Sequence, residues 1–156
     1  MARPRGGDWL EDEIASLVRS GVATIVSLLE PAEEHDLDLV DERRQAEANG
    51  IEYVSLPMPD RGVPADGRAA IAVVEEMARA VARGRRVVVH CRQGIGRAAL
   101  VACATLNRLG YSADDAMAAA GEARGCKVPE TEEQVRWLRE RAITVRLGSD
   151  SPSSSE

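Results

Sequence analysis

The chain of 156 residues has few aromatic side chains: they make up 3% of the sequence, and phenylalanine is absent. A chain of this length forms one domain with a sizeable core. Valine, leucine, isoleucine, alanine and methionine must therefore fill that core. Hydrophobic residues account for 44% and charged residues for 29% of the chain, proportions that are typical of a soluble globular protein.

Clustered positive charge is also missing. Lys127 is the only lysine, and the formal net charge is −6. Affinity for a nucleic-acid backbone depends on clusters of lysine and arginine, so we expect no nucleic-acid partner. No apolar run approaches the length that crosses a membrane, and residues 1–8 contain no apolar signal core. The sequence thus predicts no membrane association and a cytoplasmic location.

Cysteine is scarce as well. Cys91, Cys103 and Cys126 form neither a CxxC pair nor the framework of a disulfide-rich secreted protein. This pattern favours a reducing compartment. Cys103 falls on the apolar face of a predicted helix, as a buried free cysteine usually does.

Hydrophobic periodicity predicts strands that alternate with helices. Strands are predicted over 22–29, 51–56 and 86–90, and helices over 8–20, 33–48, 65–83, 96–109, 112–122 and 131–147. Asp8 is interpreted as the cap of the first helix. The alternation predicts an α/β fold with a mainly parallel central sheet flanked by helices on both faces. We expect a flexible lead-in over 1–7, one domain over 8–147 and a disordered, serine-rich tail over 148–156.

The most informative stretch runs from Val87 to Leu100. A β-branched run ends at His90, a loop over 91–97 follows, and a helical pattern resumes at Ala98. Glycines in such a loop let successive backbone N–H groups turn inward, and the start of a helix adds further free donors. The 91–97 loop therefore predicts an anion site, at the edge where parallel strands end.

The two ends of this loop carry chemistry. Cys91 lies where the same donors stabilise a thiolate and make it nucleophilic at neutral pH. Arg97 offers a planar fork that holds two phosphoryl oxygens as charge builds up in a transition state. The spacing of Cys91 and Arg97 is weak evidence by itself, but their position between a strand and a helix favours covalent chemistry on a phosphate group.

The segment His90-Cys91-Arg92-Gln93-Gly94-Ile95-Gly96-Arg97 resembles the signature loop of the cysteine-dependent protein tyrosine and dual-specificity phosphatases. The resemblance extends from about residue 9 to residue 141. It implies a dual-specificity-phosphatase-like fold and hydrolysis of phosphate monoesters through a phosphocysteine formed on Cys91. The phosphate-holding residues that it implies are Arg92, Gln93, Gly94, Ile95, Gly96 and Arg97. No metal or cofactor is expected, because the loop itself supplies a positive field.

The resemblance also implies roles outside the loop. Asp60, flanked by proline and glycine, matches the general acid that protonates the leaving group; the alternative is a turn aspartate. His90 matches a supporting histidine that holds the loop. Gln134 resembles a glutamine that orients the hydrolytic water, or is an exposed polar residue. Arg124 is interpreted either as an arginine that braces the loop or contacts phosphate, or as an ordinary solvated one.

One position departs from the family pattern. Serine or threonine usually follows the signature arginine, and its hydroxyl bonds to the cysteine sulfur and eases its departure from the phosphoenzyme. Here the residue is Ala98. We therefore expect a comparatively slow second step.

Other functions compete with this interpretation. Gly94-x-Gly96-x-x-Ala99 partly matches a dinucleotide motif, but no strand precedes Asp114, the acidic residue that would bind the ribose. Sulfurtransferase-like and arsenate-reductase-like proteins also close a cysteine loop with arginine. A catalytically weak phospho-binding module is the strongest alternative outside enzymes. As an enzyme, the chain is expected to act as a monomer on a phosphorylated protein or a small phosphomonoester.

Overall fold

A parallel three-stranded sheet organises the part of the chain that the structure, a computed structural model, describes, residues 1–142. The strands are β1 (Val22–Ser27), β2 (Glu52–Ser55) and β3 (Arg86–His90), in the order β2-β1-β3. Both pairings are parallel, with Ile25 opposite Tyr53 in β2 and Val88 in β3. The predicted α/β fold with a mainly parallel sheet is confirmed.

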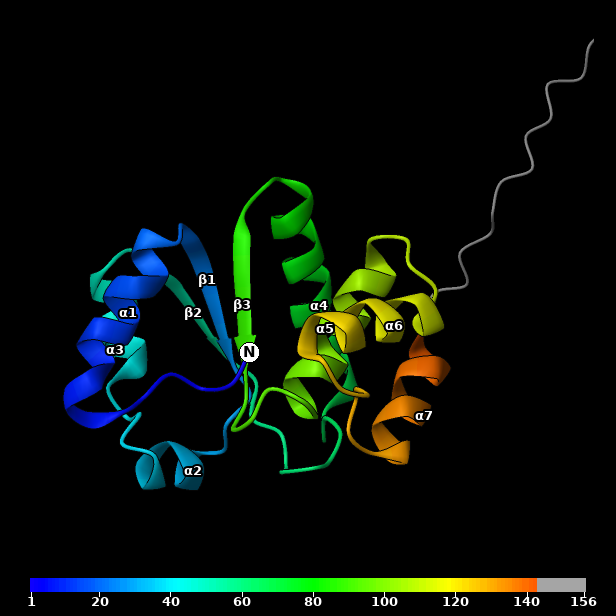
Figure 1. The fold of residues 1–156 in the computed structure, drawn as a ribbon, viewed down its shortest axis with the longest axis horizontal. Helices are drawn as coiled ribbons and strands as arrows, with labels where there is room; N and C mark the ends of the chain where they lie inside the picture. Colours follow the sequence, from blue (N-terminus) through cyan, green and yellow to red (C-terminus); the bar gives the residue numbers. More distant parts are fainter. Residues whose placement is uncertain (143–156) are drawn as a thin grey trace, which may run out of the picture.

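Helices cover both faces of this sheet, as predicted (Figure 1). Helices α1 and α3 pack on β1 and β2, whereas α4 and α5 pack on β3. Over residues 1–142, no helix is both long and apolar enough to cross a membrane. The bounds are η1 (Gly7–Trp9), α1 (Leu10–Arg19), α2 (Pro31–Asp36), α3 (Glu42–Ala48), α4 (Gly67–Ala82), α5 (Arg97–Arg108), α6 (Ala113–Arg124) and α7 (Glu132–Arg141).

Two apolar clusters fill the space on either side of the sheet. Neighbouring residues of the central strand β1 contribute to different clusters, because successive side chains of a strand point to opposite faces. Ile25 packs with Leu10 and Ile14 of α1. Val26 packs instead with Leu100 of α5. The central strand is thus buried on both faces, which explains its nearly continuous apolar sequence.

Two predictions about helices are wrong: the cap of the first helix and the single helix over 33–48. Asp8 caps no helix: it lies inside the short 3-10 turn η1, which has no side-chain cap bond. The segment 33–48 is not one helix but two, α2 and α3, because Asp38 adopts a left-handed backbone with φ of 53°. The turn between them buries Leu39 in the core. Helix α2 starts at Pro31, where a fixed φ suits a first helical turn.

The predicted C-terminal elements are described only in part. Helix α7 is described to Arg141. Residues 143–147 of the predicted final helix and the predicted tail over 148–156 lie outside the described residues.

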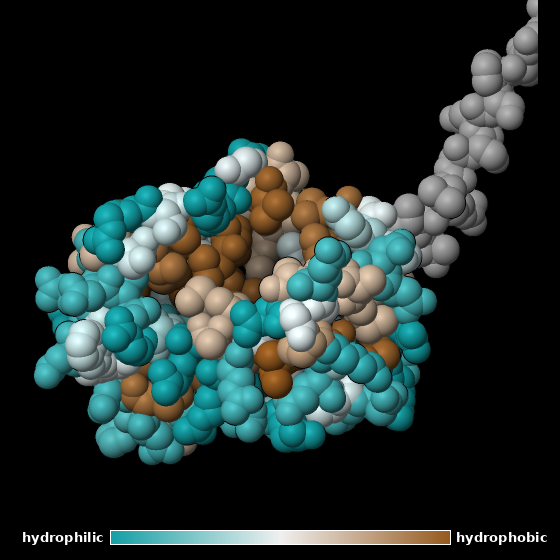
Figure 2. All heavy atoms as spheres, viewed as in Figure 1, coloured by the Kyte–Doolittle hydropathy of each residue, from teal (hydrophilic) through white to brown (hydrophobic). Residues whose placement is uncertain are grey.

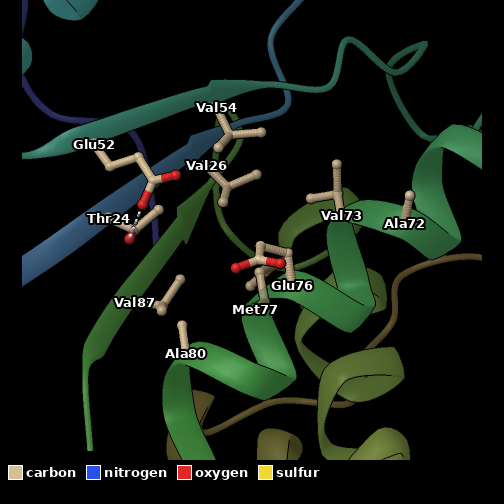
Figure 3. Close-up of a pocket in the computed structure, with 10 residues that line it drawn as sticks. All are labelled: Thr24, Val26, Glu52, Val54, Ala72, Val73, Glu76, Met77, Ala80 and Val87. Atoms are coloured by element: carbon tan, nitrogen blue, oxygen red, sulfur yellow. Dashed lines mark hydrogen bonds between the residues drawn. The ribbon is translucent and has the colours of Figure 1, made fainter. Parts of the chain in front are cut away.

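Apolar surface gathers in a hollow between the sheet and helices α4 and α5 (Figure 2). In this part of the molecule, residues of β3, α4, α5 and α6 line a cavity of about 370 Å³. A second cavity, of about 240 Å³, lies between the sheet and α4 (Figure 3). Val26, Val54 and Met77 line it, and the carboxylates of Glu52 and Glu76 stand at its sides.

The packing of α1 on the sheet leads to a stability prediction. Ile14 is fully buried, whereas Val18 of the same helix is 40% exposed. We expect Ile14→Ala to lower the free energy of unfolding by about 2–4 kcal/mol, because it leaves a cavity against β1. Val18→Ala should change it by less than about 0.5 kcal/mol. Urea unfolding of the two variants measures the difference, and equal midpoints would contradict this packing.

Candidate active site

The nucleophile predicted from the sequence lies at the edge where the parallel strands end. Cys91 directly follows β3 and is only 3% exposed. The sheet pairing extends to this point, since the N–H of Leu28 donates to the carbonyl of His90 at 3.0 Å. The backbone N–H of Gly94 donates to the sulfur of Cys91 at 3.2 Å. The 91–97 loop thus turns a backbone donor onto the sulfur.

The first residues of the segment 1–7, which the sequence predicts to be a flexible lead-in, lie against this loop. The backbone nitrogen of Met1 donates to the carbonyl of Val89 at 2.6 Å, and Ala2 forms a parallel bridge with Cys91. Gly94 has a φ of +79°, and a Cβ there would lie 2.3 Å from the carbonyl carbon of Met1. Only glycine fits at this position.

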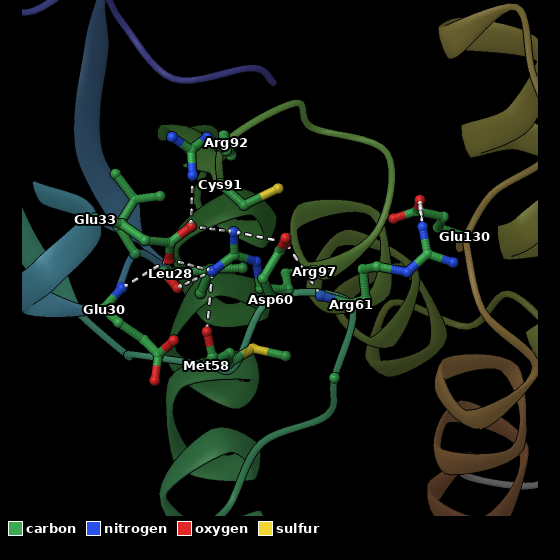
Figure 4. A network of polar contacts seen from close by, with 12 residues as sticks. Leu28, Glu30, Glu33, Met58, Asp60, Arg61, Cys91, Arg92, Arg97 and Glu130 are labelled. Carbon is green, nitrogen blue, oxygen red and sulfur yellow. Dashed lines mark hydrogen bonds and ion pairs between the residues drawn. The ribbon is translucent and has the colours of Figure 1, made fainter. Parts of the chain in front are cut away.

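Arg97 is the most completely enclosed charge of the site, with 1% of its surface exposed. Its two terminal nitrogens lie 2.6 and 2.9 Å from the carboxylate oxygens of Glu33 in α2. It also donates to the carbonyls of Leu28 and Met58, at 3.3 and 2.9 Å (Figure 4). These contacts fix the plane of the guanidinium group.

The ion pair of Arg97 and Glu33 decides the charge of both groups. Burial works against the charged form of Arg97, but the hydrogen bonds and the charge of Glu33 more than offset it and raise the pKa of the guanidinium. The hydrogen bond from Arg97 holds the pKa of Glu33 below its ordinary value. Both groups therefore stay charged at neutral pH.

Asp60 reaches the same place from the 57–64 loop between β2 and α4. Its carboxylate lies 3.1 Å from a terminal nitrogen of Arg97, and its side chain is 61% exposed. Asp60 and Cys91 line the same pocket. A pocket of about 110 Å³ joins these groups, lined by Asp60, Arg61, Cys91, Arg92, Gln93, Ile95, Gly96, Arg97 and Glu130.

The structure adds three residues to the site that sequence reasoning missed. Glu33 binds Arg97 and approaches Arg92 at 3.9 Å. Arg61 and Glu130 line the pocket and pair with each other at 2.5 Å. In the sequence, Arg61 follows Asp60 and Glu130 lies four residues before Gln134, and this was the only indication that they belong to the site. Nothing in the sequence indicated that Glu33 does.

Gln134 lies next to the 91–97 loop but does not line the pocket. It is fully buried, and a Cβ on Gly96 would lie 3.3 Å from its amide nitrogen. That nitrogen donates to the carbonyl of Gly62 at 2.9 Å, and the amide oxygen accepts from the N–H of Thr131 at 3.2 Å. In this arrangement Gln134 ties the 57–64 loop to the start of α7.

The two predicted supporting residues lie behind the loop rather than in the pocket. His90 is buried and pairs with Glu42 of α3 at 2.9 Å. Arg124 donates to the carbonyl of Gln93 at 3.2 Å, as a loop-bracing arginine would. Neither residue lines the pocket.

Neither Cys103 nor a metal-binding cluster offers an alternative reactive centre in the described residues. Cys103 is buried, which raises the pKa of its thiol to about 11 and keeps it unreactive at neutral pH. Within residues 1–142, histidine, cysteine and acidic side chains form no group of three or more that could hold a metal ion. Of the three cysteines, Cys91 is the one that lines this pocket.

Comparison with known proteins identifies a family of phosphatases. A family described as "Polymorphic toxin system, DSP-PTPase phosphatase" matches residues 1–111. No protein among curated sequences matches the chain significantly.

Solved structures of phosphatases share the fold. A kinase associated phosphatase whose catalytic-site cysteine was replaced by serine is 22% identical, with a TM-score of 0.79, over 89% of this chain and 82% of that one. The active form of Tk-PTP is 28% identical, with a TM-score of 0.71, over 84% of this chain and 86% of that one. The human tyrosine phosphatase-like serine/threonine/tyrosine-interacting protein is 23% identical, with a TM-score of 0.66, over 83% and 82%.

The family match covers most of the described chain, including both the 57–64 loop and the 91–97 loop. The fold agrees with it, since structures of dual-specificity and tyrosine phosphatases superpose on more than four fifths of the chain. The chain therefore belongs to the dual-specificity-type protein tyrosine phosphatase family of polymorphic toxin systems.

Proposed function

We propose that the chain hydrolyses phosphate monoesters through a phosphocysteine formed on Cys91. The observation that carries this proposal is that Cys91, Arg97 and Asp60 line one pocket of about 110 Å³. A nucleophile, a fixed cation and an accessible carboxylate are the three groups that phosphoryl transfer to a cysteine requires.

In the first step the thiolate of Cys91 attacks phosphorus in line with the leaving oxygen. The S–P bond forms while the P–O bond breaks, and Asp60 donates a proton to the departing oxygen. The backbone N–H groups of 92–97 and the guanidinium of Arg97 hold the other phosphoryl oxygens. Because Asp60 pairs with Arg97 in the structure, an arriving phosphate competes for that arginine and displaces Asp60, which must then carry a proton to act as the acid.

In the second step water attacks phosphorus, the S–P bond breaks and Cys91 leaves as a thiolate. Asp60, now ionised, accepts a proton from that water. The expected role of Gln134 in orienting this water remains a prediction. It would require the side chain to give up its hydrogen bonds with Gly62 and Thr131.

The pocket lining limits the class of substrate. No aromatic residue is among the described residues that line the pocket, so no aromatic wall is available to stack on a phosphotyrosine ring. Phosphoinositide phosphatases typically have lysines in the signature loop. The 91–97 loop has Arg92 and Ile95 instead, which makes a lipid substrate less favourable. A phosphorylated protein or a small phosphomonoester is therefore the substrate class that we propose.

A second candidate function rests on Ala98. Without a hydroxyl after the signature arginine, a phosphocysteine would break down slowly, and the chain could act mainly by binding phosphorylated partners. Retained binding of a phosphopeptide without turnover would favour this phospho-binding module over the enzyme.

Replacing the nucleophile tests the proposal directly. We expect Cys91→Ser to lower the hydrolysis of p-nitrophenyl phosphate by at least about a thousandfold, because a serine hydroxyl is almost fully protonated at neutral pH. Cys126→Ser is the matched control, since Cys126 is exposed and does not line the pocket. Release of p-nitrophenol measures both. Equal activity of Cys91→Ser and the wild type would exclude the proposed nucleophile.

Replacing the proposed acid should depend on the leaving group. Asp60→Asn should slow the hydrolysis of phenyl phosphate by about 100-fold or more and that of p-nitrophenyl phosphate much less, because p-nitrophenolate needs little protonation. Asp66→Asn is the control: Asp66 caps α4 and asparagine caps equally well. Steady-state rates on both substrates are the measurement. The same loss on both substrates would argue against proton donation by Asp60.

The residue after the signature arginine should control the second step. Ala98 is buried and borders the cavity of about 370 Å³, which leaves room for one more oxygen atom. We expect Ala98→Ser to raise the steady-state rate and to lower the amount of trapped phosphocysteine, which rapid acid quenching measures. If both quantities stay at the wild-type level, breakdown of the phosphocysteine does not depend on this position.

A further inference from the structure

An ion pair borders one side of the pocket, next to the proposed acid. The Nη1 of Arg61 lies 2.5 Å from the Oε1 of Glu130, and both residues line the pocket. Arg61 directly follows Asp60, but its side chain points toward Glu130 (Figure 4). Asp60 pairs with Arg97 instead. In the proposed function the leaving group departs beside Asp60, so the ion pair borders the part of the pocket that receives this group.

The two partners of this pair differ in how firmly they are held. The side chain of Glu130 is 28% exposed, and a Cβ on Gly96 would lie only 3.0 Å from its Oε2. The side chain of Arg61 is 63% exposed. Exposed ion pairs contribute little to stability, so Arg61 can be replaced by another cation at low cost. Glu130, in contrast, is packed against the 91–97 loop.

Glu130 places a negative charge beside a loop that binds phosphate in the proposed function. Like charges at such short range repel each other, and the repulsion is stronger away from bulk water. Within residues 1–142, Arg61 is the only residue that pairs with the carboxylate of Glu130. A phosphate in the pocket therefore requires that a cation stays on Glu130.

Substrates of opposite charge act differently on this pair. An anionic group that attracted Arg61 would leave Glu130 unpaired next to the phosphate. A cationic group that replaced Arg61 would keep Glu130 paired, and Arg61 would move into water. Only the second exchange avoids an unpaired carboxylate, so the pocket favours a substrate that brings its own cation.

We infer that Glu130 determines specificity: it selects phosphomonoesters that carry a positively charged group close to the phosphate, such as a phosphopeptide with arginine beside the phosphorylated residue. The cation of the substrate replaces Arg61 on Glu130, and no covalent bond changes in this exchange. The inference rests on the proposed function, which places the phosphate on the 91–97 loop. It narrows the proposed substrate class by charge.

The other charged groups of the pocket are arranged differently. Asp60, the other acidic residue among the described lining residues, pairs with the buried Arg97. Arg92 is 45% exposed and lies 3.9 Å from Glu33, on the side of α2. Glu130 is thus the carboxylate of the described lining whose partner is an exposed side chain.

Binding of phosphopeptides to the Cys91→Ser protein tests the inference without turnover. The peptides carry phosphotyrosine with either arginine or citrulline directly before or directly after it. Citrulline has nearly the shape of arginine but no charge. Isothermal titration calorimetry measures the dissociation constants. We expect at least one arginine peptide to bind about fivefold more tightly than its citrulline counterpart. Glu130→Gln should reduce this ratio to about one.

Glu133→Gln is the matched control. Glu133 is exposed, lies in the first turn of α7 and does not line the pocket. The control is needed because the formal net charge of −6 attracts any cationic peptide. Glu133→Gln removes the same charge as Glu130→Gln and should keep the wild-type ratio. Equal ratios in the two variants, no preference for arginine, or no binding of any phosphopeptide would overturn the inference.

Replacing the competing cation gives a second test. Arg61→Gln should raise the ratio by about twofold or more, because the arginine of the peptide no longer has to displace Arg61. Adding Glu130→Gln to this variant should remove the preference. Circular dichroism checks that each variant is folded. If Glu130→Gln does not fold, Arg61→Gln decides alone, and an unchanged or lower ratio overturns the inference.

Hydrolysis of p-nitrophenyl phosphate by the chain with Cys91 intact separates this inference from the proposed function. A preference for arginine peptides in a protein without phosphatase activity would keep the role of Glu130 and remove the proposed function. Phosphatase activity without any preference would keep the proposed function and overturn the role of Glu130.

Discussion

The buried charge of Arg97 is the constraint on which the rest of the site depends. A guanidinium taken out of water must have its charge paired and its donors bonded. Here the partners come from three separate segments: Leu28 after β1, Glu33 in α2, and Met58 and Asp60 in the 57–64 loop. The side chain of Arg97 therefore connects the 91–97 loop to the 57–64 loop, and the positions of the two loops depend on each other.

The break in the segment 31–48 brings two of its carboxylates, those of Glu33 and Glu42, to the region of the 91–97 loop. Residues nine apart on one α-helix lie about 13.5 Å apart along the axis and point to roughly opposite sides. Glu33 and Glu42 nevertheless bind Arg97 and His90, which lie at the two ends of the same short segment. The turn at Asp38, between α2 and α3, lets both carboxylates face it. A single helix over this segment would have supplied at most one of the two.

Local patterns were enough to predict the sheet and the 91–97 loop, because strand composition, glycine positions and the following helix all agree over a few residues. Asp60 was also within reach, since proline and glycine mark its loop and the family resemblance supplies its role. Glu33, Glu42 and Glu130 were not. Each is an acidic residue in a polar stretch, and its importance depends on a partner 48 to 69 residues away. Asp8 failed for a related reason: a capping residue type does not cap unless the backbone places it at a helix start.

The contacts of the 57–64 loop limit how far Asp60 can move. The ion pair of Arg61 with Glu130 is largely exposed on the side of Arg61, and such pairs contribute little to stability. The bonds of buried groups hold the loop more firmly: Arg97 binds the carbonyl of Met58, and Gln134 binds that of Gly62. These two anchors are only four residues apart, so Asp60 has little backbone freedom between them. Displacement of Asp60 from Arg97 is therefore a motion of its exposed side chain more than of the loop backbone.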